Sequence, residues 1–138
     1  MSERTASDNC VMSARYVLVV DDDASTREFL RHWLEAMGYD VRDAPTADIA
    51  LAMMLTDPAA IILLDIEMPG HDGLWFAERV KAAWPATAIV FASGVDNMST
   101  IERTRWLGAV DYVQKPFQWE MVAQAMRRAG RAAEAART

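Results

Sequence analysis

The sequence has a single cysteine and no long apolar run, and each absence excludes a class of protein. The one cysteine, Cys10, cannot form an internal disulfide, which fits a reducing compartment. No segment approaches the roughly 20 consecutive apolar residues of a transmembrane helix. The stretch Met1–Ser13 is polar and lacks the basic-then-apolar order of a signal peptide. The sequence therefore predicts a cytoplasmic protein that does not enter a membrane.

Positive charge is also scarce. There are 14 Lys and Arg residues against 20 Asp and Glu, and the formal net charge of −6 argues against general affinity for nucleic acid. Four arginines gather near the carboxyl end together with Glu120 and Glu134, and this mixture is typical of the solvated face of a last helix. They are Arg127, Arg128, Arg131 and Arg137. The length of 138 residues and the hydrophobic fraction of 52% indicate one globular domain.

Short apolar runs alternate with longer stretches of helical spacing from Tyr16 onward. The continuous runs predict strands at Tyr16–Val20, Ile61–Leu64, Ala88–Ala92 and Ala109–Val113. Continuous runs suit strands that are covered on both faces, whereas Tyr39–Asp43 alternates apolar and polar residues and predicts an edge strand.

Helices are predicted between these strands. The first begins at a capping box of Ser25 and Glu28 and ends at Gly38. Its apolar stripe consists of Phe29, Leu30, Trp33, Leu34 and Met37. The others run from about Ile49 to before Pro58, over Leu74–Ala83, over about Asn97–Leu107 with Gly108 as the stop, and from near Phe117 onward.

This alternation predicts an α/β fold, with a doubly wound, flavodoxin-like parallel sheet. We expect five strands in the order 2-1-3-4-5 and five helices. The domain is expected to cover 15–130, after a flexible leader over 1–14 and before a fraying tail over 131–138.

Polar side chains follow four of the predicted strands. They are Asp21, Asp22 and Asp23 after the first strand, Asp65 after Ile61–Leu64, Ser93 after Ala88–Ala92, and Lys115 shortly after Ala109–Val113. The carboxyl ends of parallel strands meet at one edge of a sheet, so we expect these groups to converge there. Ser93 or Lys115 alone is a weak signal, and the joint placement is what indicates a site.

Three carboxylates facing one cleft repel one another. At about 4 Å two carboxylates repel by about 4 kcal/mol when the effective dielectric constant is near 20, and Lys115 can neutralise only one of them. Hard oxygen ligands in this number suit Mg²⁺ (or Mn²⁺), which keeps waters that a phosphate can replace. The cluster therefore predicts a metal ion and an anionic substrate, with Lys115 as the partner of the anion. Asp23 is interpreted as the N-cap of the following helix.

Four motifs occur in order along the chain. They are Val-Val-Asp21-Asp22-Asp23 followed by Arg27, Leu-Leu-Asp65-Ile-Glu67-Met68-Pro69-Gly70 with Asp72-Gly73, Ser93-Gly94, and Tyr112-Val-Gln-Lys115-Pro116-Phe117. Together they resemble the receiver domains of bacterial response regulators of the chemotaxis type. The resemblance covers about Tyr16 to Arg128. Ser93 stands where the family more often has Thr, and Glu67 adds a carboxylate near the expected metal.

The resemblance implies a phosphorylation-dependent switch in a two-component phosphorelay. Asp65 would accept a phosphoryl group from a sensor histidine kinase or a histidine phosphotransfer protein. Asp22, Asp65 and the backbone carbonyl of Glu67 would bind Mg²⁺ directly, and Asp21 would bind it through water. Such a receiver phosphorylates and dephosphorylates itself, and it is not a turnover enzyme on an external substrate.

The resemblance also implies how the signal leaves the site. Ser93 and Lys115 would hold phosphoryl oxygens, Gly94 would leave room for the donor, and the peptide bond before Pro116 would be cis. Tyr112 would turn inward when Ser93 shifts toward the phosphate. This movement would alter the face made by the fourth helix, the fifth strand and the fifth helix, where a downstream protein would bind.

Two other functions remain open at this point. The run Asp21-x-Asp23-x-Ser25 is similar to the nucleophile loop of haloacid-dehalogenase-type phosphatases, with Asp21 as nucleophile and Asp23 as general acid. That interpretation leaves Asp65 and Lys115 unexplained. Alternatively, the chain is a receiver-like binding module that works without phosphorylation. Trp106 and Trp119 flank the expected output face and are interpreted as partly buried, although exposure there would favour a docking site.

Overall fold

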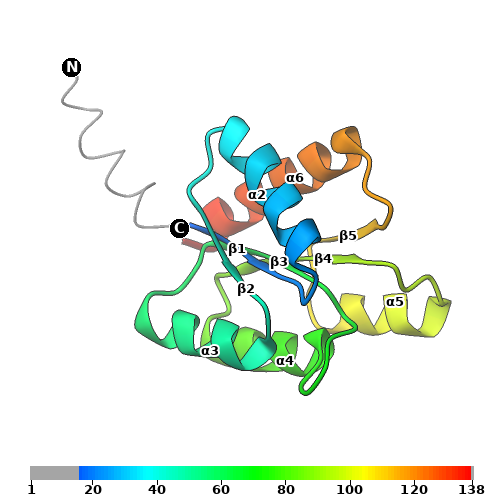
Figure 1. Cartoon of the computed structure of the whole chain (residues 1–138). Coiled ribbons are helices and arrows are strands. Elements are labelled where there is room, and N and C mark those ends of the chain that lie inside the picture. Colours follow the sequence, from blue (N-terminus) through cyan, green and yellow to red (C-terminus); the bar gives the residue numbers. More distant parts are fainter. Residues whose placement is uncertain (1–15, 138) are drawn as a thin grey trace.

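Five strands and five helices alternate along residues 16–137, the part of the chain that a computed structural model describes (Figure 1). The strands are β1 (Val17–Val20), β2 (Val41–Ala44), β3 (Ile61–Leu64), β4 (Ala88–Ser93) and β5 (Asp111–Gln114). The helices are α2 (Ala24–Ala36), α3 (Ala47–Thr56), α4 (Gly73–Ala83), α5 (Met98–Trp106) and α6 (Trp119–Arg137). The leader expected over 1–14, which includes Cys10, lies outside the described residues.

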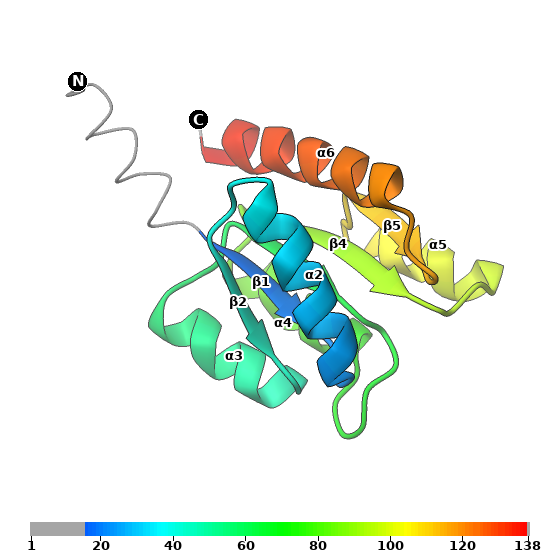
Figure 2. The same cartoon turned by 45° about the horizontal axis from the view of Figure 1, so that its top comes forward.

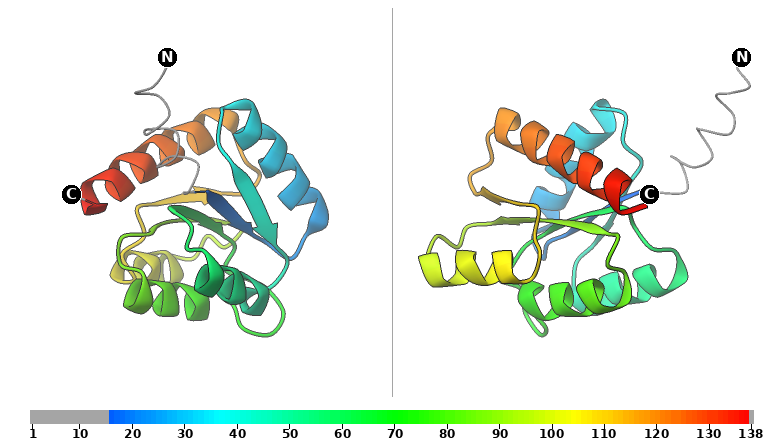
Figure 3. Two further views of the ribbon diagram at one scale, coloured as in Figure 1. Left: turned by 90° about the vertical axis from the view of Figure 1, so that its left-hand side faces the viewer. Right: turned by 180° about the vertical axis from the view of Figure 1, so that it is seen from behind.

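The strands form one parallel sheet in the order β2-β1-β3-β4-β5, which confirms the predicted flavodoxin-like topology (Figure 2). Helices α2 and α6 cover one face of the sheet, and α3, α4 and α5 cover the other (Figure 3). Because all the strands run in the same direction, their carboxyl ends lie along one edge. The order reverses between β1 and β3, where ligands of open α/β sheets bind.

A hydrophobic core lies on each face of the sheet, between the strands and the helices that cover them. Val17 and Val19 of β1 pack in the core under α2 and α6, whereas Leu18 and Val20 pack in the core under α3 and α4. Strands β1, β3 and β4 are buried throughout, as their continuous apolar runs predict. Strand β2 is the predicted edge strand, with half-exposed middle residues, although it begins at Val41 rather than at Tyr39.

Asp23 is the N-cap of the first helix, as predicted, and the predicted capping box of Ser25 and Glu28 is wrong. The Asp23 carboxylate accepts a hydrogen bond from the backbone N–H of Thr26 at 3.3 Å and from its hydroxyl at 2.6 Å. Ser25 lies inside α2, because the helix begins immediately after Asp23. Only three residues, Asp21 to Asp23, therefore separate α2 from the carboxyl end of β1, which keeps the acidic loop short.

Strand β5 begins two residues later than predicted. Gly108 has a φ of 80° and ends α5, and its N–H donates to the carbonyl of Arg105 at 2.9 Å. The N–H of Ala109 donates to the carbonyl of Thr104 at 3.1 Å. These bonds hold Ala109 in the turn that closes the helix, so the strand starts at Asp111.

Not every residue of the apolar stripe that is predicted for the first helix is buried. Leu30 and Leu34 are buried, but Phe29 is 49% exposed and is not a core residue. Its ring contacts Trp33 at a centroid distance of 4.5 Å, and Trp33 contacts Trp119 of α6 edge-on at 4.8 Å. Trp119 thus covers one side of Trp33, and Phe29 lies at the margin beyond it.

Helix α6 is the longest helix among the described residues. It includes 131–137, where a fraying tail is expected from the sequence, and Ala133 within this segment is buried. None of the helices within residues 16–137 combines the length and the apolar character that crossing a membrane requires.

Gly73 lets α4 begin in contact with the end of β3. A Cβ atom on Gly73 would lie 2.1 Å from the backbone oxygen of Asp65, a distance that real Cβ atoms do not reach. The N–H of Gly73 also donates to the carbonyl of Ile66 at 2.8 Å. The residue after β3 and the first residue of α4 are therefore in direct backbone contact.

We expect Gly73→Ala to lower the free energy of unfolding by about 1–3 kcal/mol, because the added methyl group must push the two backbone segments apart. Urea unfolding measures this change. The matched control is Gly130→Ala inside α6, where an added Cβ meets no heavy atom within 4 Å. The control should gain about 0.5–1 kcal/mol from the better helix propensity of alanine. Equal losses in both variants would contradict the close contact at Gly73.

Candidate functional site

The carboxyl ends of β1 and β3 hold two buried aspartates side by side. The strands pair in register up to Val20 and Leu64, and the N–H of Asp65 then donates to the carbonyl of Val20 at 2.9 Å. On the other side, the N–H of Asp21 donates to the carbonyl of Ala44 in β2 at 3.2 Å. The sheet hydrogen bonding thus extends one residue past the strands and sets the positions of both aspartates.

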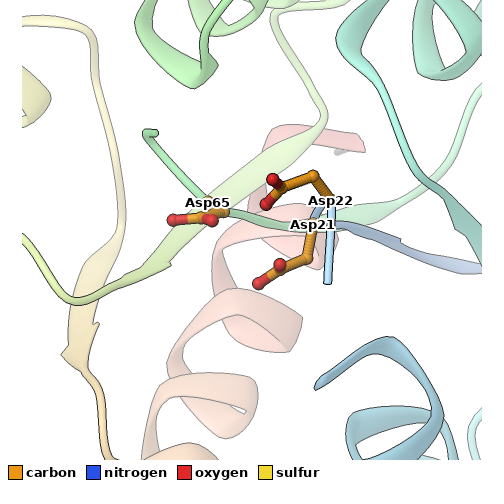
Figure 4. A group of neighbouring side chains, drawn as sticks. All are labelled: Asp21, Asp22 and Asp65. Atoms are coloured by element: carbon orange, nitrogen blue, oxygen red, sulfur yellow. The ribbon is translucent and has the colours of Figure 1, made fainter. Parts of the chain in front are cut away.

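Asp22 completes an acidic cluster with Asp21 and Asp65 (Figure 4). One carboxylate oxygen from each residue can be chosen so that all three lie within 4.8 Å of one another. Asp21 and Asp65 are buried, whereas Asp22 is exposed, so the cluster faces solvent on the Asp22 side. This all-oxygen donor set fits a hard divalent cation such as Mg²⁺, which is bound by a few carboxylates and keeps several waters.

Lys115 brings a positive charge to the same cluster from the end of β5. Its Nζ donates to Oδ2 of Asp21 at 2.9 Å and lies 3.6 Å from Oδ2 of Asp65. The N–H of Lys115 donates to the carbonyl of Ser93 at 2.9 Å, and the Lys115–Pro116 peptide bond is cis. Burial opposes the charged form of Lys115, but the hydrogen bond to Asp21 and the charge of Asp65 outweigh it and raise its pKa.

The surroundings of Asp65 disfavour its ionised form. Burial raises the pKa of Asp65, and the negative charge of Asp21 raises it further. A hydrogen bond from the Ser93 side chain, the charge of Lys115 and the backbone N–H of Ile66 act in the opposite direction and do not cancel the rise. A cation beside Asp65 would remove this cost by stabilising the ionised carboxylate.

Ser93 and Tyr112 connect the cluster to the last strands. Ser93, at the end of β4, is buried, and its Oγ accepts a hydrogen bond from the N–H of Val95 at 3.4 Å. The half-buried side chain of Tyr112 on β5 is turned inward, and its hydroxyl donates to the backbone carbonyl of Val95. Its ring lies over Phe91 of β4 at a centroid distance of 6.5 Å.

The remaining residues singled out by sequence lie around the mouth of the site. Gly94 is exposed, and an added Cβ would meet nothing within 4 Å, so its position leaves room on the solvent side. Glu67 is exposed on the loop that follows β3. The carboxylate of Asp23 is bonded to Thr26 at the start of α2.

Two partners in this region were not expected from the sequence. The carbonyl of Val95 accepts the Tyr112 hydroxyl, and the carbonyl of Asp21 accepts a hydrogen bond from Arg27 at 2.7 Å. Backbone carbonyls have no signature in the residue type, so no sequence signal could have identified them.

A family model described as the response regulator receiver domain matches residues 17–127. The C4-dicarboxylate transport transcriptional regulatory protein DctD of Rhizobium meliloti is 32% identical over 117 residues, which are 85% of this chain and 25% of that protein. The response regulator MprA of Mycobacterium bovis is 38% identical over 118 residues, which are 84% of this chain and 50% of MprA. The chain thus spans between a quarter and a half of the length of these relatives.

Solved structures show the same similarity in three dimensions. The chemotaxis protein CheY4 of Vibrio cholerae has a TM-score of 0.78 at 27% identity, over 83% of this chain and 98% of that one. A CheY-like response regulator receiver domain protein of Methanospirillum hungatei has a TM-score of 0.80 at 23% identity, over 87% of this chain and 97% of that one. The latter similarity supports the fold.

In metal-free buffer we expect Asp65→Asn to stabilise the protein at neutral pH. The raised pKa means that the native state binds the Asp65 proton more tightly than the unfolded state does. Stability is therefore lost as pH rises from the ordinary pKa through the raised one, and the variant avoids that loss. Thermal unfolding in EDTA should show the two proteins converging below about pH 4 and separating toward pH 7. Asp40→Asn is the control, because Asp40 is exposed near the amino end of β1. A wild type that is more stable than Asp65→Asn at pH 7 would contradict the prediction.

We expect Lys115→Met to destabilise the metal-free protein, because Asp21 and Asp65 lose their shared positive partner. Millimolar Mg²⁺ should restore most of the lost stability, since a cation takes over the neutralisation. Lys81→Met is the control, because Lys81 is exposed on α4. Thermal unfolding with and without Mg²⁺ measures both effects, and equal losses in the two variants would argue against a local role of Lys115.

Proposed function

The chain belongs to the response regulator receiver domain family, whose general function is that of a phosphorylation-dependent switch, and from this premise we propose that it is the switch of a two-component phosphorelay with Asp65 as phosphoacceptor. One arrangement supports this proposal above all. Asp65 lies beside Asp21 and Asp22, and Lys115 pairs with both Asp21 and Asp65, at the point where the strand order reverses. A carboxylate nucleophile, further acidic ligands and a lysine are together the groups that phosphoryl transfer requires.

In the proposed reaction, a carboxylate oxygen of Asp65 attacks the phosphorus of a phosphohistidine. The P–O bond to Asp65 forms as the P–N bond breaks, and the histidine of the donor leaves with the electron pair of that bond. The ionised carboxylate needs no general base, so catalysis depends on positioning and on charge. The donor is a sensor histidine kinase or a histidine phosphotransfer protein.

The surrounding side chains hold the transferred group. Mg²⁺, when bound by Asp22, Asp65 and the backbone carbonyl of Glu67, with Asp21 acting through water, supplies positive charge to the phosphoryl oxygens. Lys115 exchanges its bond to Asp21 for a bond to a phosphoryl oxygen, and the Ser93 hydroxyl donates to another. Gly94 keeps the approach of the donor open. Exposed Glu67 adds negative charge at this mouth.

Tyr112 transmits the state of the site. The hydrogen bond between its hydroxyl and the Val95 carbonyl ties the inward ring to the loop that follows Ser93. A phosphoryl group that draws Ser93 toward Asp65 favours this inward arrangement, so phosphorylation shifts the population of conformers. A cavity of about 370 Å³, lined by Thr104, Tyr112 and their neighbours, lies between α5 and β5 beside the ring.

The face made by α5, β5 and α6 is where we place the downstream protein. Trp106 of α5 is 84% exposed and Trp119 of α6 is 38% exposed, so the expectation that Trp106 is partly buried is wrong. An exposed tryptophan on α5, the helix that contributes residues to the lining of the cavity, favours a docking surface. We place the switch in the cytoplasm of a bacterium and expect it to act through protein contacts, with no direct nucleic-acid or membrane binding and no turnover of an external substrate.

We expect wild-type protein to gain one phosphoryl group when it is incubated with acetyl phosphate and Mg²⁺, as measured by intact mass. Asp65→Asn should gain none, and EDTA should abolish the modification. Asp40→Asn, at the opposite edge of the sheet, should behave as the wild type does.

The same measurement separates the other functions. If Asp21→Asn abolishes modification while Asp65→Asn retains it, the nucleophile is Asp21 and the chain acts like a haloacid-dehalogenase-type phosphatase. If the wild type gains no mass and has no affinity for Mg²⁺, the chain is a receiver-like module that works without phosphorylation.

A further inference from the structure

Arg27, in the second turn of α2, reaches back to the acidic loop. Its side chain is 17% exposed, and its Nη1 donates to the backbone carbonyl of Asp21 at 2.7 Å. Its Nε donates to Oδ2 of Asp43 in β2 at 3.2 Å. The guanidinium is therefore held at two points, and one of them is a peptide group of the site.

Every polar group of Asp21 has a partner. The N–H is bonded to the carbonyl of Ala44 at 3.2 Å, and the carboxylate accepts hydrogen bonds from the N–H of Asp23 and from Lys115, each at 2.9 Å. Arg27 supplies the partner of the carbonyl. Residue 21 therefore has little freedom to rotate.

Asp22 is held in a different way. It is exposed, and no residue within 16–137 donates a hydrogen bond to its carboxylate. Its direction therefore depends on the backbone from which it projects. The carbonyl that Arg27 holds belongs to the planar peptide between Asp21 and Asp22, so fixing that carbonyl fixes the plane from which the Asp22 side chain departs.

We propose that Arg27 is a positioning residue of the acidic site, which orients the Asp21–Asp22 peptide and so directs Asp22 toward the cation shared with Asp65. This inference rests on the proposed function, because it concerns the same cation. Asp43 has a supporting role, since it holds the guanidinium from the edge strand. Strand β2 thereby contributes to the site without providing a ligand.

Charge and position predict opposite effects of removing Arg27. A guanidinium near a cation site repels the cation, so loss of its charge alone would strengthen Mg²⁺ binding. Loss of the hydrogen bond that orients Asp22 would weaken Mg²⁺ binding. The sign of the change in affinity therefore distinguishes a positioning role from a nearby charge.

Arg31 offers a matched control on the same helix. It lies one turn after Arg27, and its Nη1 is 3.6 Å from Oδ1 of the same Asp43. Its Nη2 donates to the carbonyl of Val41 in β2 at 3.2 Å, and no contact joins it to Asp21 among residues 16–137. Replacing it removes the same charge and a similar tie to β2 without touching the Asp21–Asp22 peptide.

The experiment is a Mg²⁺ titration followed by amide chemical shifts in NMR spectra, for the wild type, Arg27→Met, Arg31→Met and Arg27→Lys. We expect the Kd for Mg²⁺ to rise about tenfold in Arg27→Met, as is typical when a residue that orients a metal ligand is lost. Arg31→Met should bind Mg²⁺ as tightly as the wild type or more tightly. Arg27→Lys keeps the charge and a donor, so its affinity should lie between those of the wild type and Arg27→Met.

In metal-free spectra the resonance of the Asp22 amide, which belongs to the peptide that Arg27 holds, should shift in Arg27→Met and stay in place in Arg31→Met.

An unchanged or lower Kd in Arg27→Met would overturn the inference, as would equal weakening in Arg27→Met and Arg31→Met. If Arg27→Met does not fold, Arg27→Lys and Asp43→Asn decide the question. Weaker Mg²⁺ binding in both supports the inference, and wild-type affinity in both overturns it. If the wild type binds Mg²⁺ and accepts a phosphoryl group, but Arg27→Met binds Mg²⁺ as tightly as the wild type does, this inference alone is wrong. Wild-type protein that does neither overturns the proposed function and this inference together.

Discussion

The enforced proximity of Asp21 and Asp65 is the constraint on which the site depends. Strands β1 and β3 are neighbours in register, and the main-chain hydrogen bonds that extend past them hold the backbones of the two buried aspartates side by side. Burial and the charge of Asp21 raise the pKa of Asp65 as a consequence. Lys115 offsets only part of this repulsion. A site with unneutralised negative charge on a rigid support is one that gains stability from a divalent cation and can then receive an anionic phosphoryl group.

Each strand of the sheet contributes to this one edge by a different physical means. Strands β1 and β3 carry the acids, β4 and β5 bring Ser93 and Lys115, and β2 supplies the carbonyl of Ala44 and the carboxylate that holds Arg27. Gly73 allows α4 to begin against the backbone of Asp65. The inward side chain of Tyr112 then links this edge to the cavity between α5 and β5. The site and the proposed output face therefore share strand β5.

Three of the local predictions that failed did so because neighbouring residues or elements decided what the pattern along the chain left open. The sequence offered both Asp23 and Ser25 as caps of the first helix, and Asp23 is the N-cap, since its carboxylate accepts two bonds from Thr26. Ala109 belongs to the turn that closes α5. It is therefore not part of β5, although it is apolar and close to that strand in sequence. Phe29 fits the apolar stripe of the helix but is 49% exposed, because Trp119 packs on Trp33, one turn further along the helix. Apolar periodicity indicates which face of a helix is buried, and the neighbouring elements decide how far along that face burial extends.

The sequence by itself determined the class of fold and which side chains follow the strands, because apolar runs, alternation and strand-end polar residues depend on local order along the chain. The strand order was predicted as the simplest arrangement of five parallel strands, and the tertiary structure confirmed it. It also identified the acidic residues, Ser93 and Lys115 as the chemically informative set. Only the tertiary structure decided that Lys115 pairs with both Asp21 and Asp65, that Trp106 is exposed, and that Arg27 holds the carbonyl of Asp21. These features depend on distances between segments far apart in sequence and on backbone groups that every residue shares, so residue types alone do not reveal them.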